Sequence, residues 1–321
     1  MIGVVGGGAW GTALAQVMAQ DEDVVLWARE AAVVAAINTA HENPDFLPGV
    51  VLSPRIRATG TTADLAAADV WLVVAPAQHL RGVLAECPVA SRPALVLCSK
   101  GIEAASLLLM AEVAAQVACD LPVAVLSGPT FAGEVARGLP TAVTLACGDA
   151  AVAAALVARL ARPAFRPYLS DDVTGAEIGG AVKNVLAIAC GVVEGAGLGL
   201  NARAALIARG FAEMTRFGLA RGARAETLAG LSGLGDLVLT CSSANSRNFA
   251  LGTGIGRGEL AATLLDTRTV AEGAATAPVL IAAARAIGVE MPIAAAVAAL
   301  LAGAPVAATV AALLGRPLRT E

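Results

Sequence analysis

Short apolar runs separated by alanine-rich stretches fill the first half of the chain. Runs without polar alternation are typical of strands that are covered on both faces of a sheet. Such runs lie at 2–5, 24–27, 70–75, 94–98, 123–127 and 141–146. Helical patterns lie between them, for example at 12–20, 30–39 and 105–118. This alternation predicts an α/β fold built on a doubly wound parallel sheet.

Strand patterns stop near Asp171, and the rest of the chain is expected to be helical. The predicted helices, joined by glycine-rich turns, span 175–195, 203–221, 223–230, 246–256, 271–287, 293–302 and 306–314. The pattern therefore predicts two domains, a sheet domain at 1–174 and an all-helical domain at 175–321.

The stretch from Met291 to Gly315 carries no charge and is long enough to cross a bilayer. Pro292 and Pro305 interrupt it, however, and alanine dominates its composition. We interpret it as two short buried helices, 293–302 and 306–314. We therefore expect no membrane span.

Composition narrows the function classes. Hydrophobic residues make up 57% of the chain and aromatic residues only 3%, so the apolar content is mainly Ala, Val and Leu. Charged residues amount to 15%, fewer than in a typical soluble domain, which indicates that some surface is buried between subunits. A net charge of -4 provides no basic footprint for nucleic acid.

Cysteine and histidine usage argues against a metal site. None of the six cysteines lies in a CxxC pair, and the chain has only two histidines, His41 and His79. Metal-ligand spacing is absent from the sequence, and we expect reduced, mostly buried thiols. The first predicted strand begins at Ile2 and leaves no room for a signal peptide, so we expect a cytoplasmic protein.

A glycine-rich loop follows the first predicted strand and precedes the first predicted helix. Residues 6–11 (GGGAWG) fit GxGxxG, with Gly6, Gly8 and Gly11 at the fixed positions. The first glycine permits a tight turn, the second lets the backbone approach a pyrophosphate, and the third lets helix and strand pack closely. Unpaired N–H groups at the helix start favour the anion. The loop therefore predicts a dinucleotide site rather than an ordinary turn.

The end of the second predicted strand bears on the choice of cofactor. Arg29 and Glu30 follow this strand. An acidic residue there suits the ribose hydroxyls of NAD, and an arginine suits the 2′-phosphate of NADP. Arg29 comes first, so the sequence favours NADP(H) and leaves NAD(H) open; the alternative for Arg29 is a solvated loop charge.

Lys183 is the most informative charged residue. It lies in a long run of small and apolar residues, where an ammonium group is costly unless something pairs with it or uses it. Partial desolvation also lowers the pKa of a lysine towards neutrality, which suits proton transfer. A dinucleotide and such a lysine together make a minimal alcohol dehydrogenase.

Several loops should lie at the carboxyl ends of strands, where open α/β sheets bind ligands. Lys100 follows the strand at 94–98 and is either a phosphate contact or a surface residue. The loop 127–132 (SGPTFA) either offers backbone groups to the nicotinamide or is a plain turn. His79 is interpreted as a structural or rim histidine, because Lys183 already fills the acid/base role.

The predicted helical domain carries further polar candidates. Asp236 follows several glycines and is expected in a tight turn, where it pairs with Lys183, binds a substrate hydroxyl or caps the turn. Ser246-Arg247-Asn248 begins a predicted helix and either grips a phosphate through Arg247 and the helix-start amides or caps the helix. Glu272 opens another predicted helix, a position that the dipole favours.

These segments, in this order and spacing, resemble NAD(P)+-dependent glycerol-3-phosphate dehydrogenase of the bacterial type. The resemblance runs through almost the whole chain and rests on GGGAWGTALA at 6–15, SKGIE at 99–103, LSGPTFAGEVARGLPTAV at 126–143, GGAVKNVLAIACG at 179–191, NARAALIARG at 201–210, GLGDLVLTC at 233–241, SRN at 246–248 and EGAATAPVL at 272–280. Several of these motifs are long and specific.

The resemblance implies an N-terminal Rossmann-like domain, a helical C-terminal domain and a homodimer. It implies that NAD(P)(H) interconverts sn-glycerol 3-phosphate and dihydroxyacetone phosphate for phospholipid synthesis. The family's proton-transferring lysine falls on Lys183, with Asp236 beside it in the catalytic role. Its substrate contacts fall on Lys100, Gly128, Thr130, Asn184, Asp236, Thr240, Ser246, Arg247 and Asn248.

The family's cofactor contacts fall on the glycine loop and on Trp10, Arg29, Lys100, Ala132, Arg247, Val270 and Glu272. Ala9 departs from the pattern, because many members carry serine there. The loss removes a hydroxyl near the pyrophosphate but leaves the backbone amides in place.

Two rival interpretations stay open at this stage. Another two-domain dehydrogenase with a lysine acid, acting on a hydroxy acid, would also use arginine to bind a carboxylate. A nicotinamide-sensing regulator would bind the cofactor without catalysis, although Lys183 in its apolar run argues against it.

Overall fold

The computed structural model describes residues 1–265 and 271–317. By their internal contacts these residues form two units. The first comprises Met1–Lys100 and Leu108–Glu177, and the second comprises Gly101–Leu107 and Ile178–Glu321. Val270, an expected cofactor contact, lies outside the described residues.

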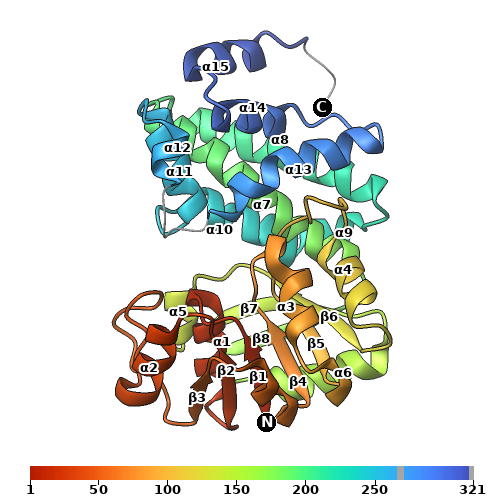
Figure 1. Ribbon diagram of the computed structural model, residues 1–321. Helices are drawn as coiled ribbons and strands as arrows, with labels where there is room; N and C mark the ends of the chain where they lie inside the picture. Colours follow the sequence, from red (N-terminus) through yellow and green to blue (C-terminus); the bar gives the residue numbers. More distant parts are fainter. Residues whose placement is uncertain (266–270, 318–321) are drawn as a thin grey trace. The chain divides into compact units, whose positions relative to one another are not determined.

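The first unit is built on one sheet, which among the described residues has eight strands in the order β3-β2-β1-β4-β5-β6-β7-β8 (Figure 1). The strands are β1 Ile2–Val5, β2 Val24–Trp27, β3 Ile56–Thr59, β4 Val70–Val73, β5 Ala94–Leu97, β6 Val123–Ser127, β7 Thr141–Ala146 and β8 Phe165–Ser170. Strand β1 pairs in parallel with both β2 and β4, with Ile2 opposite Val24 on one side and Val70 on the other. Successive strands are added on one side of β1 as far as β3 and then on its other side from β4 onward. Doubly wound folds bind ligands at this point, where the strand order reverses.

The predicted doubly wound sheet is confirmed, but two details of the prediction are wrong. Strand β7 runs antiparallel to β6, with Ser127 opposite Thr144, so the sheet is not wholly parallel. Strands β3 and β8 were not expected, and they lie at the two edges of the sheet. Edge strands are covered less completely, so they lack a continuous apolar run; β8 even contains Pro167, which an edge strand tolerates.

Helices cover both faces of this sheet. One core cluster joins the sheet to α1 Ala9–Met18, α2 Ala31–Ala40, α5 Ala132–Ala136 and α6 Ala150–Leu160. The other joins it to the 3₁₀ segment η1 Thr62–Ala67, α3 Leu80–Glu86 and α4 Met110–Val117. Short 3₁₀ turns, η2 Ala77–His79 and η3 Val89–Ser91, flank α3. Apolar residues on both faces explain why the central strands carry unbroken apolar runs.

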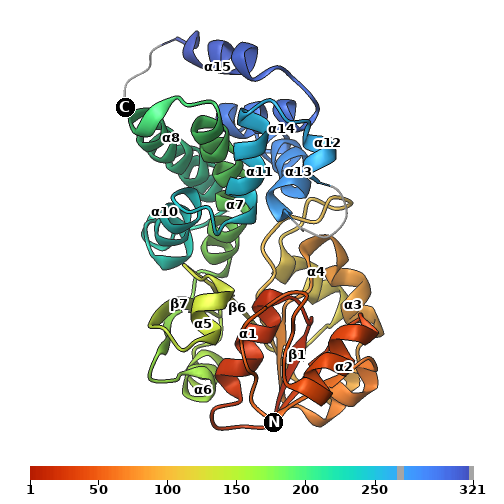
Figure 2. The ribbon, with the colours of Figure 1, turned by 90° about the vertical axis from the view of Figure 1, so that its left-hand side faces the viewer.

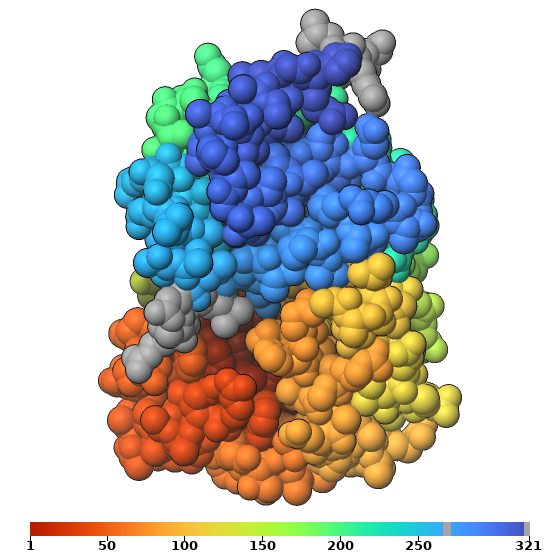
Figure 3. Space-filling view, turned by 45° about the horizontal axis from the view of Figure 1, so that its top comes forward, coloured from red at the N-terminus to blue at the C-terminus, as the bar shows by residue number. Residues whose placement is uncertain are grey.

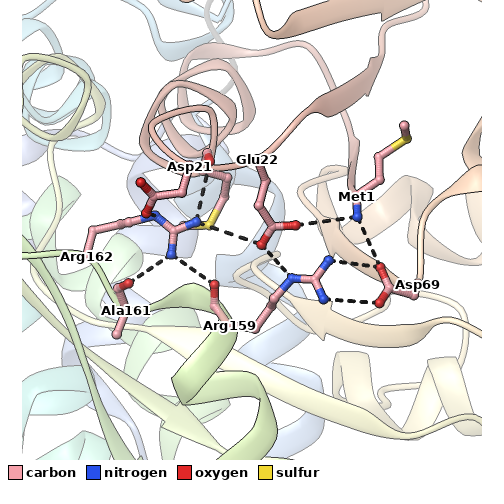
Figure 4. Close-up of polar contacts among 8 residues, drawn as sticks. Met1, Asp21, Glu22, Asp69, Arg159, Ala161 and Arg162 are labelled. Carbon is pink, nitrogen blue, oxygen red and sulfur yellow. Dashed lines mark hydrogen bonds and ion pairs between the residues drawn. The ribbon is translucent and has the colours of Figure 1, made fainter.

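A charged network ties the sheet to α6 (Figure 4). The Arg159 guanidinium donates to Glu22 and, through two parallel bonds, to Asp69. Arg162 is buried and donates to the backbone carbonyls of Arg159, Ala161 and Met18. Its Nε lies 3.0 Å from Asp21, an ion pair whose angle does not meet hydrogen-bond geometry. Arg159 and Arg162 therefore connect three segments that are separate in the chain: the end of α1 with residues 21–22, Asp69 before β4, and the end of α6.

All regular elements of the second unit within the described residues are helical, and α7 begins in the last residues of the first unit. Its elements are α7 Val173–Gly195, α8 Gly199–Ala220, α9 Ala225–Ala229, the π-helical segment η4 Leu231–Gly235, α10 Asp236–Cys241, α11 Arg247–Gly256, α12 Ala261–Leu264, α13 Glu272–Ala286, α14 Pro292–Leu301 and α15 Val306–Leu314. Helix α7 lies among α8, α10, α11 and α13 (Figure 2). A Cβ added at Gly191 of α7 would lie 2.1 Å from the Phe249 carbonyl oxygen, so α7 and α11 meet backbone to backbone.

Helix α7 is the one helix among the described residues that is long and apolar enough to cross a membrane. Its apolar window is completely buried within the protein, as expected of a core helix. Both short C-terminal helices were predicted to be buried, and for α15 this prediction is wrong. Helix α15 has no buried residue, and Leu314 is 80% exposed. Figure 3 shows the dark blue atoms of this region at the surface.

Candidate active site

Lys183 is paired, as its apolar surroundings require. Its Nζ donates to Asp236 Oδ1 at 2.7 Å and to Thr240 Oγ1 at 2.9 Å. The Thr240 hydroxyl donates to the same carboxylate oxygen at 3.2 Å. Lys183 is 6% exposed and Asp236 is fully buried, so the attraction between the charges is weakly screened by water. The three residues form a preorganised group centred on the lysine ammonium.

Asp236 does not lie in a tight turn, which corrects the expectation from sequence. It is the first residue of α10 and directly follows the π-helical segment Leu231–Gly235. A Cβ at Gly179 would lie 2.3 Å from the Ser232 carbonyl oxygen, so this glycine lets α7 approach the π-helical segment closely. Such segments are frequent at functional sites. Here the segment delivers Asp236 to the side of Lys183.

Two thiols adjoin the lysine group. The hydrogen bond between Cys190 and Cys241, together with burial, raises the pKa of the Cys241 thiol well above its ordinary value. Cys241 therefore stays neutral beside Lys183 and Asp236. All six cysteines are free and only Cys119 is exposed, which confirms the predicted thiols. The cysteine pair was missed from sequence, although Cys190 follows Lys183 by two helical turns and Cys241 follows Thr240 directly.

The Ser246-Arg247-Asn248 segment combines a cap with an exposed cation. Ser246 caps α11 by accepting a hydrogen bond from the Phe249 amide. Arg247, in the first turn, is exposed to solvent. Its position at a helix N-terminus suits an anion, since amides and guanidinium contribute together.

Asn248 connects three helices. Its Nδ2 donates to Asn184 Oδ1 on α7 at 3.1 Å, and its Oδ1 accepts the Gly273 amide of α13 at 3.0 Å. A Cβ at Gly273 would lie 2.5 Å from the Asn184 carbonyl oxygen, so the beginning of α13 is held tightly against α7. Glu272, the first residue of α13, is half-buried at this junction. The arrangement brings the expected substrate asparagines and the expected cofactor glutamate together.

The glycine loop of the first unit has the geometry that the sequence predicts. Gly6 has a φ of +129°, which favours glycine, and its amide donates to the Trp27 carbonyl. Gly8 caps α1, and a Cβ built there meets no atom within 4 Å. A Cβ at Gly11 would lie 1.9 Å from the Gly6 carbonyl oxygen. The loop thus leaves open space beside Gly8 at the N-terminus of α1, a position that suits an anion.

Asn43 braces this loop and was missed from sequence. Its fully buried side chain donates to the Gly7 carbonyl at 2.9 Å and to the Thr12 hydroxyl at 2.8 Å. Thr12 in turn donates to the Gly7 carbonyl. The residue lies far along the chain in an irregular segment, so no local pattern linked it to the loop.

The remaining adenosine-side candidate is accessible. Arg29 follows β2, has a side chain 79% exposed, and pairs with Glu30 at 3.2 Å. An exposed pair of this kind contributes little to stability. The Arg29 guanidinium can therefore leave Glu30 and bind a ligand phosphate at little cost in stability.

A narrow crevice at the ends of β5 and β6, too tight in this structure to admit a water molecule, is lined by the other candidates of the first unit. Trp10, Lys100, Gly128 and Thr130 line it. Lys100 Nζ and Thr130 Oγ1 both donate to the Gly128 carbonyl oxygen, each at 3.3 Å. Ala9 and Ala132 begin α1 and α5, which pack together. His79 is exposed in a 3₁₀ turn and is not part of this crevice.

A doubly wound sheet unit with a glycine loop over α1, followed by a helical unit, is the architecture of nicotinamide-dependent dehydrogenases. Within the described residues, no group of three or more His, Cys, Asp or Glu is placed to hold a metal ion. The chain belongs to the NAD-dependent glycerol-3-phosphate dehydrogenase family. The N-terminal profile of that family matches residues 1–153, and the C-terminal profile matches residues 172–311.

Individual relatives agree with this assignment. The chain is 67% identical to "Glycerol-3-phosphate dehydrogenase [NAD(P)+] 1" of Sphingopyxis alaskensis, over 91% of this chain and 88% of the relative. It is 63% identical to "Glycerol-3-phosphate dehydrogenase [NAD(P)+]" of Erythrobacter litoralis, over 100% and 97%. The crystal structure of glycerol-3-phosphate dehydrogenase from Coxiella burnetii superposes with a TM-score of 0.93 at 36% identity, covering 98% of both chains.

Proposed function

We propose that the protein is an NAD(P)-dependent glycerol-3-phosphate dehydrogenase that interconverts dihydroxyacetone phosphate and sn-glycerol 3-phosphate, with Lys183 as general acid and base. The observation that carries the proposal is the buried group of Lys183, Asp236 and Thr240. A buried ion pair is a poor source of stability, because desolvation offsets the attraction. A buried ion pair in this chain is therefore better explained by chemistry than by folding.

In the proposed mechanism Lys183 acts on the carbonyl oxygen of dihydroxyacetone phosphate. When bound, the reduced nicotinamide supplies hydride to the C2 carbon of the substrate. The Lys183 ammonium donates a hydrogen bond to the C2 oxygen, stabilises the growing alkoxide and then donates a proton. Asp236 orients the ammonium and balances its charge in the buried site. Thr240 restrains both partners, and Asn184 follows Lys183 on the same helix as a substrate contact.

The substrate phosphate is assigned to the start of α11. Arg247 supplies a planar pair of donors, and Ser246, Asn248 and the helix N-terminus add further groups. Binding energy from the phosphate, which does not react, then positions the carbonyl for hydride transfer. Lys100, Gly128 and Thr130 are assigned to the same substrate from the crevice of the first unit.

The cofactor is assigned to the glycine loop. Gly6, Gly8 and Gly11, with Ala9 and Trp10, would hold the pyrophosphate over α1, and the exposed guanidinium of Arg29 favours the 2′-phosphate of NADP(H) over NAD(H). Lys100, Ala132, Arg247, Val270 and Glu272 are the further assigned contacts. In this assignment residues 1–174 bind the cofactor and residues 175–321 bind and convert the substrate.

The wider role follows from the product. We assign the protein to the cytoplasm and its product, sn-glycerol 3-phosphate, to phospholipid synthesis. The low share of charged residues leaves more apolar surface than usual, and a homodimer would cover part of it. The free cysteines support a reducing compartment.

The test is a cofactor-oxidation assay with purified protein. Dihydroxyacetone phosphate and unphosphorylated dihydroxyacetone are offered with NADPH and NADH in parallel, and oxidation is followed by loss of reduced-cofactor absorbance. We expect rapid turnover that depends on the substrate phosphate, and turnover lowered at least about 100-fold in Lys183→Ala with cofactor binding retained.

The same assay separates the rivals. Turnover of hydroxy or keto acids in preference to the phosphate ester would identify a hydroxy-acid dehydrogenase. Cofactor binding without oxidation of any candidate substrate would identify a sensor. Either result would sink the proposed reaction, and near-normal turnover in Lys183→Ala would overturn the role of the lysine.

A further inference from the structure

The side chain of Ser127 lacks a hydrogen-bond partner. Ser127 is the last residue of β6 and is 3% exposed, yet its Oγ bonds to no atom of the described chain. A buried hydroxyl left unsatisfied costs about 1–3 kcal/mol, so proteins seldom retain one without a use. The cost indicates a partner that is supplied by a ligand.

The surroundings of Ser127 support this interpretation. Ser127 lines the same crevice as Trp10, Lys100 and Thr130. The polar groups of Lys100 and Thr130 both point to the Gly128 carbonyl oxygen rather than to Ser127. Both bonds are long, at 3.3 Å, and are readily exchanged for contacts with a charged ligand.

Strand pairing and close packing surround Ser127 at the end of β6. Gly128 has a φ of +153°, and a Cβ added there would lie 2.9 Å from Val143 Cα on β7. Ser127 itself is paired with Thr144 of β7. The hydroxyl is therefore held at the strand end, where a ligand group that enters the crevice can hydrogen-bond it.

The position in the sheet identifies the half of the cofactor that would reach this strand. In doubly wound sheets the dinucleotide lies across the carboxyl ends of the strands, with its adenosine on the β1–β2 side and its nicotinamide beyond β4. Strand β6 lies on the nicotinamide side, two strands from β4. On the nicotinamide ring itself, the carboxamide, with one acceptor and two donors, is the group that a serine hydroxyl satisfies.

We infer that the Ser127 hydroxyl hydrogen-bonds the nicotinamide carboxamide and is a positioning residue that fixes the orientation of the ring. The inference rests on the proposed cofactor site and adds a contact that selects for the nicotinamide half alone. Ligand entry displaces Lys100 and Thr130 from the Gly128 carbonyl and exposes the hydroxyl to its partner.

The test compares two ligands that differ only in the nicotinamide. NADPH and 2′-phospho-ADP-ribose are titrated calorimetrically into the wild-type protein and Ser127→Ala. We expect Ser127→Ala to weaken NADPH binding about five- to tenfold and to leave the nicotinamide-free ligand unchanged. Its unfolding temperature without ligand should be equal to or higher than that of the wild type, because an unsatisfied polar group has been removed.

Ser99→Ala is the matched control. Ser99 follows the neighbouring strand β5 and is also buried, but its hydroxyl donates to the Ala75 carbonyl. Its removal should lower the unfolding temperature without discriminating between the two ligands. An NADPH analogue with an acetyl group in place of the carboxamide should show a smaller difference between wild type and Ser127→Ala, if the hydroxyl accepts from the amide.

Three outcomes would overturn the inference: equal weakening of both ligands by Ser127→Ala, no weakening of NADPH, or a lower unfolding temperature without ligand. The first and third assign Ser127 a structural role. A rise in the KM for dihydroxyacetone phosphate with NADPH binding unchanged would assign the hydroxyl to the substrate instead. Failure of the wild-type protein to bind NADPH would refute the proposed function, and the inference with it.

Discussion

Lys183 Nζ and Asp236 Oδ1 lie 2.7 Å apart although 53 positions separate them in the chain. The pair joins the middle of α7 to the first residue of α10 in a region that water scarcely reaches. An isolated buried charge costs several kcal/mol, so each residue depends on the other. Catalysis and folding therefore respond together to a change at either position.

Asp236→Asn keeps the shape of the side chain but removes its charge. We expect kcat to fall at least about 100-fold, because the lysine loses the partner that orients it, while the Kd for the cofactor changes little. Steady-state kinetics and calorimetric titration check both quantities. Glu194→Gln, in an exposed ion pair near the end of α7, should leave kcat unchanged. An unchanged kcat in Asp236→Asn would remove Asp236 from the mechanism.

Arg247→Ala tests the phosphate assignment. The lost charge-assisted hydrogen bonds should raise the KM for dihydroxyacetone phosphate about 10- to 100-fold, with the protein still folded because Arg247 is exposed. Arg257→Ala, at the opposite end of α11 and also exposed, is the control for charge alone. A KM equal to that of the control would place the phosphate elsewhere.

Arg29→Ala tests the cofactor preference. We expect the KM for NADPH to rise about tenfold and the KM for NADH to change little, since only NADPH carries the 2′-phosphate. Parallel kinetics with both cofactors measure the ratio. Arg55→Ala removes another exposed, ion-paired arginine of the same unit and should not alter that ratio; equal effects of Arg29→Ala on both cofactors would refute a phosphate contact.

Glu213 introduces a pH dependence into stability. The carboxylate, on α8, is 2% exposed and accepts the backbone amides of Ile293 and Ala294 at the beginning of α14. Burial raises its pKa from 4.5 to about 7, against the opposing effects of these amides and of Arg216 and Arg316. Between these values the folded state holds a proton that the unfolded state has released.

Stability should therefore fall as pH rises through this window. The contribution of Glu213 is complete below about pH 4.5 and lost above about pH 7, a change of about 3 kcal/mol. Urea unfolding across this range should show a smaller decline in Glu213→Gln, while the exposed Glu226→Gln should follow the wild type. Identical slopes in wild type and Glu213→Gln would show that the raised pKa does not exist.

Arg162→Ala tests the charged network that joins α6 to the segments before β2 and β4 (Figure 4). The change removes the guanidinium donor from the carbonyls of Arg159 and Ala161, whereas the Met18 carbonyl still accepts the amides of Asp21 and Glu22. The free energy of unfolding should therefore drop by about 2–3 kcal/mol. Arg166→Ala, exposed on β8, should change it by less than about 0.5 kcal/mol. Denaturant titration of both variants, with kcat as a check on the distant chemistry, measures the difference; equal stabilities would show that solvent replaces the guanidinium.

Local sequence determined the central strands, most helices and the glycine loop. Strands β1, β2, β6 and β7 begin and end where their apolar runs do, because burial on both faces requires an unbroken run. Gly6, Gly8 and Gly11 could be assigned their geometry from spacing alone, since Gly6 and Gly11 need a missing Cβ beside neighbouring backbone and Gly8 leaves open space over α1.

Tertiary structure decided the features that depend on partners distant in the chain. The direction of β7, the edge strands, the π-helical approach to Asp236 and the exposure of α15 carry no local signature. The apolar surroundings of Lys183 in the sequence predicted that it needs a partner. The sequence did not identify Asp236 and Thr240, because these hydrogen bonds form only when α7 packs against α10. Asn43, the Cys190–Cys241 pair and the unsatisfied hydroxyl of Ser127 were invisible for the same reason, because a hydrogen bond is a property of two folded positions rather than of one residue.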